Sequence, residues 1–279
     1  MLIPNAYSTR GTMKLWMRKV YVAGLTWVDV VVLAICVCLL GVLGLKLLGM
    51  GETRRIWVCK HRLGNLGAAF AKYANDRSDT LPPAVVDVGR ETTTWDWSLA
   101  SYLTESSSGV DSAGKEKLKQ ELWPTFCCPS DTEPRGGEAP RSYSMPMYDV
   151  KKVGWPPTED SQGGLGLYLD TDRWKLIREA EPTLPAGSTP VIRLSIVPNP
   201  GWTALLVEQI TIRNTMFSTN FAATPGPRDQ WNAKTISLEN FHRGKLNYLM
   251  LDGHVERLTI RESGGHAGNG GVWTIRAWD

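Results

Sequence analysis

An apolar run near the N-terminus constrains the fold of this chain more than any other feature. Val30–Leu45 carries no charge, and apolar neighbours beyond Asp29 and Lys46 extend the run over residues 25–50. As a helix it would be about 39 Å long at about 1.5 Å per residue. That length is enough to cross the ~30 Å hydrocarbon core of a bilayer. We therefore expect a transmembrane helix over 25–50.

Asp29 is the residue that membrane insertion alone does not explain. Lys46 can reach the headgroups with its long side chain, whereas a carboxylate in hydrocarbon costs about 2.5–3.5 kcal/mol. A charge retained at that cost indicates a function. The simplest interpretation is a signal-anchor helix with Asp29 at the headgroup level. A cleaved secretory signal fits less well, because its apolar region would be shorter.

The residues before Asp29 follow a recognisable order. A basic leader precedes Gly24, Leu25 follows, and Asp29 lies five positions after Gly24. This order resembles a type IV prepilin, a family that includes the pilins and the type II secretion pseudopilins. The resemblance implies that a prepilin peptidase cuts between Gly24 and Leu25, that the new N-terminus is methylated, and that Asp29 contacts a neighbouring subunit's amine. Leu25 stands where Phe or Met is usual, and Asp29 where Glu is usual.

The composition narrows the remaining choices. The net charge is +3, and Lys and Arg are scattered along the chain, which excludes nucleic acid as the expected partner. The residues after position 50 are ample for one sizeable core. Twelve tryptophans are many for 279 residues, and several lie in Gly/Pro-rich stretches. We expect them to fill a core beneath long loops, with an aromatic platform for sugar or peptide as the alternative.

The helical pattern continues beyond the apolar run. Apolar side chains recur there at spacings of three and four, which places them on one helix face: Ile56, Cys59, Leu63, Leu66, Phe70 and Tyr73. The helix should end near Asn75–Asp79, because Leu81-Pro82-Pro83 cannot continue it. We expect this face to lie on a later sheet.

The rest of the chain predicts a mixture of short helices and strands. Short helices are expected at 92–105 and 112–122, with an irregular, Pro- and Gly-rich excursion at 124–166. The expected strands are 191–197, 203–212, 245–251, 254–260 and 272–277.

The five cysteines leave two interpretations open. Cys36 and Cys38 lie in the apolar run, Cys59 lies on the buried stripe, and Cys127 and Cys128 are adjacent. In an oxidising compartment Cys59 would have two possible disulfide partners; otherwise these are buried free thiols. The adjacent pair argues against zinc, because structural zinc sites usually space their cysteines by two to four residues.

A second motif begins at His242 and ends at Asp252-Gly253. Asp-Gly between two strand-like runs is a strong hairpin signal. A catalytic or metal cluster of His242, Asp252 and His254 would require these side chains to meet. His242 and Asp252 lie at opposite ends of one strand, roughly 30 Å apart if fully extended. A turn role for Asp252 is therefore the better interpretation.

The spacing of this motif resembles the H-X9-DG signature of the DUF1559 family of prepilin-like proteins. Over about residues 18–260 other segments resemble that family in the same order: Cys59–Tyr73, Leu81–Pro83, Trp95–Leu103, Cys128–Asp131 and Leu205–Glu208. The resemblance implies a possible Cys59–Cys128 disulfide, with Cys128 rather than Cys127 as the partner. It implies architecture and location, but no reaction.

These observations predict an α+β, pilin-like fold, in which a long N-terminal transmembrane and amphipathic helix packs on an antiparallel β-sheet. The expected parts are a cytoplasmic leader (1–24), a transmembrane helix (25–50), its amphipathic continuation (51–78) and a periplasmic α+β domain (79–279). The expected location is the inner membrane, with a single pass.

The predicted function is structural: a minor subunit or associated factor of a type II secretion or type IV pilus-like assembly. Its expected partners are a prepilin peptidase, other pilin-like subunits and membrane lipid. The alternative is a membrane-tethered periplasmic module that binds glycan or peptide. We expect neither an enzyme nor a cofactor or metal site, since nothing resembles a phosphate loop, a nucleophile elbow or closely spaced metal ligands.

Overall fold

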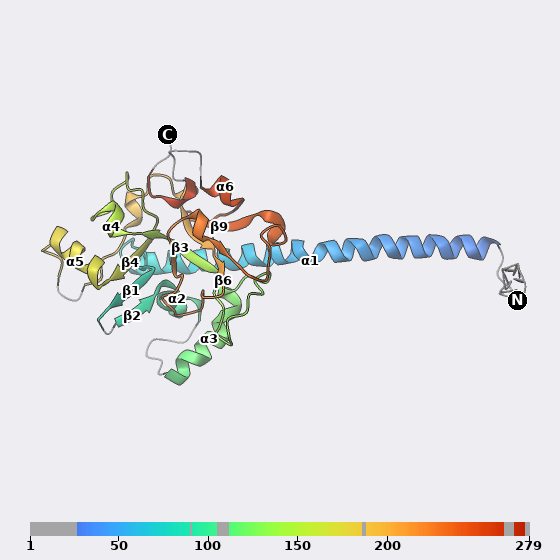
Figure 1. The fold of residues 1–279 in the computed structure, drawn as a ribbon, viewed down its shortest axis with the longest axis horizontal. Coiled ribbons are helices and arrows are strands. Elements are labelled where there is room, and N and C mark those ends of the chain that lie inside the picture. The colour runs from blue at the N-terminus through green and yellow to red at the C-terminus, as the bar shows by residue number, and fades with distance from the viewer. Residues whose placement is uncertain (1–26, 90, 105–111, 186–187, 265–270, 277–279) are drawn as a thin grey trace, which may run out of the picture. The chain divides into compact units, whose positions relative to one another are not determined.

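The computed structural model describes residues 27–89, 91–104, 112–185, 188–264 and 271–276 (Figure 1). The chain divides into two compact units, Met1–Gly49 and Met50–Asp279. The boundary falls within helix α1, Trp27–Asp76. The leader 1–24 and the expected processing junction at Gly24 and Leu25 lie outside the described residues.

The expectation of a transmembrane helix over 25–50 is wrong. Among the described residues, no helix combines the length and the hydropathy that crossing a bilayer requires.

In the second unit, α1 buries one face. The residues of the predicted stripe from Ile56 to Phe70 are all buried, and Tyr73 is partly buried. The helix ends at Asp76, and the chain then turns through Ser78 and Asp79, which both have positive φ. This end lies where the following prolines predict it.

The described residues of the second unit form two sheets. The larger has the strand order β10-β9-β5-β3-β4-β1-β2, with β7 paired to β3; the smaller pairs β6 with β8. The strands of the larger sheet are β1 (Val85–Val88), β2 (Glu91–Thr94), β3 (Tyr143–Tyr148), β4 (Gly166–Asp170), β5 (Ala204–Glu208), β7 (Ala223–Thr224), β9 (Leu246–Met250) and β10 (Val255–Leu258). The smaller sheet consists of β6 (Ile210–Thr211) and β8 (Trp231–Asn232).

The sheet is mixed, so the prediction of an antiparallel sheet is wrong. β4 runs parallel to both β1 and β3, and β7 runs parallel to β3. The chain passes from β3 to β4 through residues 149–165, a crossover long enough to bring a strand back in the same direction. Gly166 permits the close approach of β4 to β3, because a Cβ there would lie 2.5 Å from Cβ of Met145.

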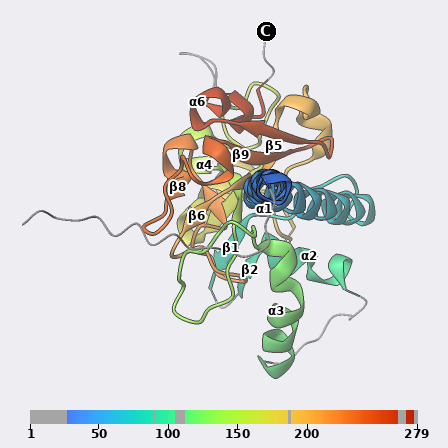
Figure 2. The same cartoon turned by 90° about the vertical axis from the view of Figure 1, so that its right-hand side faces the viewer.

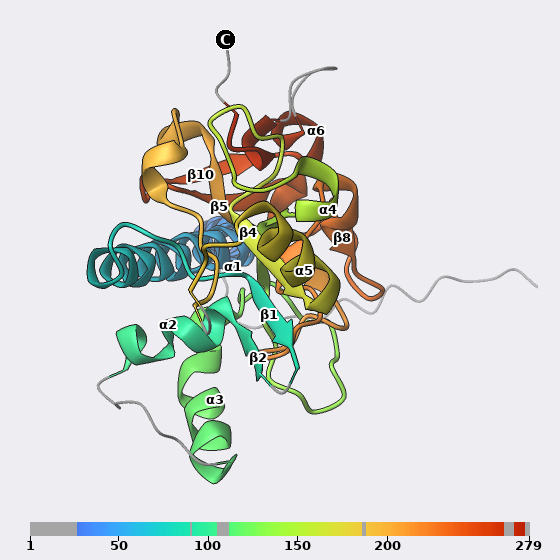
Figure 3. The ribbon, with the colours of Figure 1, turned by 90° about the vertical axis from the view of Figure 1, so that its left-hand side faces the viewer.

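Short helices surround the sheet. They are α2 (Trp95–Leu103), α3 (Ser112–Phe126), α4 (Val150–Val153), α5 (Thr171–Ala180) and α6 (Ile260–Ser263). α2 and α3 lie together, and α6 lies on the opposite side of this unit (Figures 2 and 3). The strands expected at 191–197 and 272–277 are wrong, since Leu194–Ile196 and Gly271–Trp273 form 3-10 turns.

The core lies between the buried face of α1 and the sheet. Gly67 of α1 faces Leu249 of β9 so closely that a Cβ would lie 3.0 Å from its Cδ1. Farther along α1, the Phe70 ring stacks on Trp95 of α2 with the ring centroids 5.7 Å apart, and Phe126 contacts the same indole. The core-filling role expected for tryptophan holds for Trp95 and Trp273, which are both buried. It is wrong for Trp202, which is 39% exposed, and for Trp57 and Trp123, which are also exposed.

Candidate functional site

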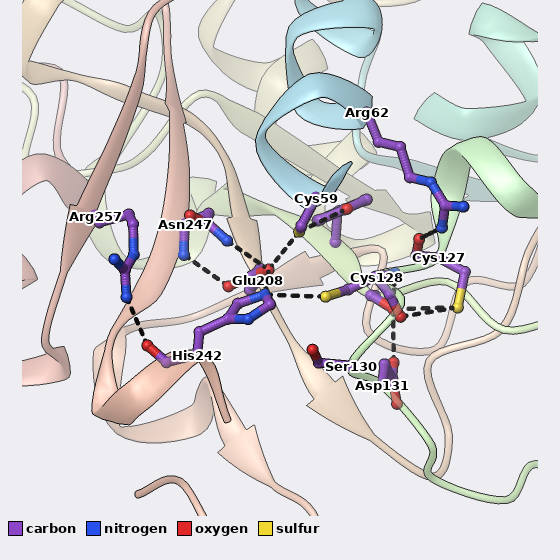
Figure 4. Close-up of polar contacts among 12 residues, drawn as sticks. Cys59, Arg62, Cys127, Cys128, Ser130, Asp131, Glu208, His242, Asn247 and Arg257 are labelled. Atoms are coloured by element: carbon purple, nitrogen blue, oxygen red, sulfur yellow. Dashed lines mark hydrogen bonds and ion pairs between the residues drawn. The ribbon is translucent and has the colours of Figure 1, made fainter. Parts of the chain in front are cut away.

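Four buried side chains from four separate segments meet beneath α1 (Figure 4). Cys59 comes from α1, Cys128 from the segment before β3, Glu208 from the end of β5, and His242 from the 3-10 turn before β9. Each is fully buried. One potential ligand atom from each lies within 4.8 Å of all the others. We call these four residues the buried cluster.

The contacts within the buried cluster are short. The Cys59 thiol donates to Glu208 Oε1 at 2.7 Å, and Cys128 Sγ lies 3.1 Å from His242 Nε2. The same imidazole nitrogen lies 3.2 Å from Glu208 Oε1. The Tyr143 hydroxyl lies 3.1 Å from Cys59 Sγ. Nε2 of His242 and Oε1 of Glu208 therefore lie at the centre of the group.

Glu208 and His242 stabilise each other's charged forms. Burial acts to raise the pKa of Glu208, but His242 and the hydrogen bonds to the carboxylate outweigh it and lower that pKa. Burial likewise acts to lower the pKa of His242, but Glu208 and Cys59 raise it to about 11. Asn247 supports the carboxylate, donating from its backbone N–H to Oε2 at 2.6 Å and from its side-chain amide to Oε1 at 3.0 Å.

Contacts outside the buried cluster orient His242. Glu52, also on α1, places Oε1 2.9 Å from His242 Nδ1 and accepts the backbone N–H of His242 at 3.1 Å. The backbone carbonyl of His242 accepts from Arg257 at 2.6 Å. His242 has φ +47°, a left-handed conformation that costs free energy in a residue other than glycine. The surrounding contacts therefore hold the imidazole in one position.

The Cys128-Pro129-Ser130-Asp131 segment fixes Cys128. Ser142 Oγ accepts the backbone N–H of Cys128 at 2.8 Å and donates to Asp131 Oδ2 at 2.6 Å. Asp131 in turn forms an ion pair with Arg135 at 2.7 Å. Ser130 donates to Glu52 Oε1 at 3.1 Å. These bonds connect the Cys128 segment to Ser142, the residue before β3, and to the carboxylate that orients His242.

The structure brings together some residues that the sequence singled out and separates others. Cys59, Cys128 and His242 meet, whereas Asp252 and His254 lie at the β9–β10 turn. There, Asp252 Oδ1 accepts the backbone N–H of His254 at 3.1 Å, and Gly253 has φ +93°. This arrangement supports the turn role that we preferred for Asp252 over a catalytic one.

Other predicted site residues lie elsewhere, and two partners were missed. Asp29 lies in the first turn of α1 in the first unit. Sequence reasoning assigned no role to Glu208 or to Glu52. An acidic residue at the end of the apolar run Leu205–Glu208 was the available signal for Glu208. The sequence around Glu52 does not mark it as a site residue, because glutamate is common on the solvent-exposed faces of helices.

Cys128, His242 and Glu52 are linked in series by hydrogen-bond distances, as are the nucleophile, the base and the orienting carboxylate of a catalytic triad. Its environment does not suit a thiolate nucleophile. Burial, together with contacts to Cys59 and the charge of Glu208, raises the pKa of the Cys128 thiol well above its ordinary value. Reactive cysteines instead have lowered pKa values and partial exposure. The arrangement therefore fits a structural role better than catalysis.

Cys59 and Cys128 are both free thiols in the structure. The disulfide implied by the family resemblance stays a prediction, although the two sulfurs lie within 4.8 Å of each other. Two thiols, one imidazole and one carboxylate are also a donor set that Zn²⁺ accepts.

Comparison with known proteins returns nothing: no protein-family model, curated protein or solved structure matches the chain. Membership of the prepilin-like family therefore stays a prediction.

Proposed function

We propose that this chain is a structural, pilin-like subunit that joins its neighbours through the N-terminal part of α1. The observation that carries the proposal is the exposure of apolar side chains there. Trp27 is 80% exposed and Leu40 is 71% exposed. Other large apolar residues in the same stretch are also exposed: Val28, Val30, Val31, Val32, Leu33, Ile35, Val37 and Leu39. Contiguous exposed apolar surface of this kind marks an interaction site.

The distribution of these side chains indicates what covers them. Val30–Leu33 are four consecutive exposed residues and so occupy every side of the helix. A helix that is apolar all round needs partners on all sides, whereas a helix in one groove needs only one apolar stripe. The core of a bundle of N-terminal helices provides such an environment. We therefore assign the neighbours as the corresponding helices of other pilin-like subunits.

The resemblance to prepilins supports this assignment. It implies processing between Gly24 and Leu25 by a prepilin peptidase, after which Asp29 would be the fifth residue of the mature chain. An acidic residue in the first turn of a helix interacts favourably with the helix dipole. Within a bundle it would also be placed to pair with a neighbour's N-terminal amine. The type II secretion or type IV pilus-like system and the periplasmic location of 79–279 belong to the same proposal.

Two native cysteines allow a direct test. Cys36 and Cys38 are exposed on the helix, whereas Cys59, Cys127 and Cys128 are buried. We would attach a maleimide with a photoreactive arm to the full chain in its native host and irradiate. The proposal predicts crosslinks from Cys36 or Cys38 to the N-terminal helix of another copy or of another prepilin-like subunit. C36S/C38S is the matched control and should give none. Crosslinks to chains without such a helix, or monomer alone, would contradict the proposal.

The alternative, a glycan- or peptide-binding module, has one observation in its favour. A pocket of about 260 Å³ is lined by Trp155, Pro156, Pro157 and neighbouring residues. It is smaller than most ligand pockets, and the Trp155 indole already donates to Glu181 at 2.9 Å. Glycan-array binding that is lost in W155A, together with no helix crosslinks, would favour this second function.

A further inference from the structure

The buried cluster brings together four atoms of the kinds that bind metal ions. Two sulfurs, one imidazole nitrogen and one carboxylate oxygen converge within 4.8 Å in the interior of the second unit. In a tetrahedral zinc site, with bonds of about 2.0–2.3 Å, neighbouring ligand atoms lie roughly 3.3–3.8 Å apart. Three contacts within the buried cluster, at 2.7, 3.1 and 3.2 Å, are somewhat shorter than this range, and every pair of ligand atoms lies within 4.8 Å. To bind an ion, the Cys59–Glu208 contact would lengthen by at least about 0.6 Å, and no pair of ligand atoms would have to move closer by more than about 1 Å.

The surroundings of the four residues also match those of a metal site. A metal-binding histidine commonly donates its second ring N–H to a carboxylate, which fixes the ring and its tautomer. Glu52 Oε1 lies 2.9 Å from His242 Nδ1 and provides this partner, so that Nε2 points into the buried cluster. The carboxylate of Glu208 is fixed in the same way by the two donors of Asn247.

We propose that Cys59, Cys128, Glu208 and His242 form a structural zinc site. The ligand atoms would be the two Sγ atoms, one carboxylate oxygen of Glu208 and Nε2 of His242. On binding, the two thiol protons and any proton on Nε2 pass to solvent, and the sulfurs bind as thiolates. Four protein ligands fill a tetrahedral coordination sphere, so the site is closed and leaves no position for a substrate.

The donor types select zinc over other common ions. Thiolates disfavour Mg²⁺ and Ca²⁺, which prefer oxygen ligands, and a four-coordinate mixture of sulfur, nitrogen and oxygen suits Zn²⁺. The sequence argument against zinc considered only cysteines that are close in the chain. Here the ligands come from α1, the Cys128 segment, β5 and the turn before β9.

The site would connect the N-terminal helix to the rest of its unit. Cys59 lies on α1, and the other three ligands lie on segments that follow the helix in the chain. Because the unfolded chain does not assemble such a site, the free energy of metal binding contributes to folding. The ion would therefore hold α1 against the sheet. This inference is independent of the proposed assembly, since it concerns only the second unit.

The test uses the full chain isolated without a reductant. Zinc is measured on the native protein, and a second portion is then denatured and its free thiols are alkylated with any disulfides left intact. We expect one zinc ion per chain by elemental mass spectrometry, and both Cys59 and Cys128 alkylated. After removal of the metal with a chelator and a reductant, Co²⁺ should restore binding. The bound Co²⁺ should show the visible bands of tetrahedral coordination and a near-ultraviolet thiolate charge-transfer band.

Matched variants separate the site from general damage. C128S should lose the metal and the charge-transfer band, whereas C127S, which changes the adjacent cysteine outside the buried cluster, should retain both. E52Q leaves all four ligands in place and should weaken zinc binding by about tenfold to a hundredfold while keeping the stoichiometry. A native Cys59–Cys128 disulfide, an absence of tetrahedral Co²⁺ uptake, or equal metal loss in C127S and C128S would overturn the proposal.

Discussion

A buried ion pair between Asp96 and Arg141 gives the most quantitative prediction about the fold. Both side chains are fully buried, and Arg141 Nη1 lies 2.9 Å from Asp96 Oδ2. The guanidinium also donates to Asn214 Oδ1 at 2.8 Å and to two backbone carbonyls. Asp96 accepts the backbone N–H of Phe217 at 2.7 Å. The pair therefore connects α2 to the segment just before β3 and to the loop after β6.

Asp96→Asn removes the counter-ion and leaves the shape nearly unchanged. Arg141 then keeps its charge in a fully buried site without the carboxylate that paired with it. Breaking a buried pair from one side costs about 3–5 kcal/mol. A typical free energy of unfolding is about 5–15 kcal/mol, so this one change should remove a large share of it.

The assay is urea unfolding of the full chain in a mild detergent, which covers the exposed apolar side chains of α1. Asp172→Asn is the matched control, because Asp172 lies 2.8 Å from Lys151 with both side chains substantially exposed. That variant should barely move the unfolding midpoint. R141M should itself be costly, because Arg141 also donates to Asn214 Oδ1 and to two backbone carbonyls. In D96N/R141M the two losses should be less than additive, with a coupling free energy of about 2 kcal/mol or more. A D96N cost below about 1 kcal/mol, or additive effects in the double variant, would refute this reasoning.

Three further predictions follow from packing and charge. Leu66→Ala, on the buried stripe of α1, should lower the free energy of unfolding by about 2–5 kcal/mol in the same urea assay; a loss near zero would place that face in solvent. Gly64→Ala should raise the melting temperature slightly, because a Cβ there meets no atom within 4 Å and alanine favours the helix. Gly166→Ala should lower the melting temperature, because its Cβ would clash with Met145 of β3. A change of the same sign for both variants would contradict the close contact between β4 and β3. Burial acts to raise the pKa of Asp149, but the ion pair with Arg173 outweighs burial and lowers that pKa from its usual value of ~3.8. The pair therefore stabilises the folded chain above pH ~3.8, and this stabilisation is lost as the pH falls through the lowered pKa. R173M should therefore flatten the acid limb of a stability-versus-pH curve, and an unchanged acid limb would count against the pairing.

The sequence predicts the helices better than the sheet. The stripe on α1 repeats with the helical period, and its end is determined locally by Leu81-Pro82-Pro83. The central strand β3, by contrast, contains Pro146 and lies in a stretch rich in Pro and Gly, which are local signals against a strand. Its pairing with β4, β5 and β7 overrides those signals. Strand direction depends on such distant partners, so the mixed sheet could not be read from local patterns.

In the candidate site, too, the local sequence identifies single residues but not the contacts between distant segments. Cys59, Cys128 and His242 each stood out in the sequence, through the stripe or through a motif. Their convergence did not, because it depends on how four segments pack around α1. The search for catalytic partners of His242 considered Asp252 and His254, its neighbours in the motif, whereas its contacts in the fold are Glu52 and Glu208. A motif identifies a residue, but only the fold identifies its partner.

Mass spectrometry of the mature N-terminus, on protein isolated from its native host, tests the proposed pilin-like function most directly. We expect a chain that begins at Leu25 and carries a methylated amine, which places Asp29 as its fifth residue. An intact leader beginning at Met1, or cleavage at a position other than Gly24–Leu25, would contradict it.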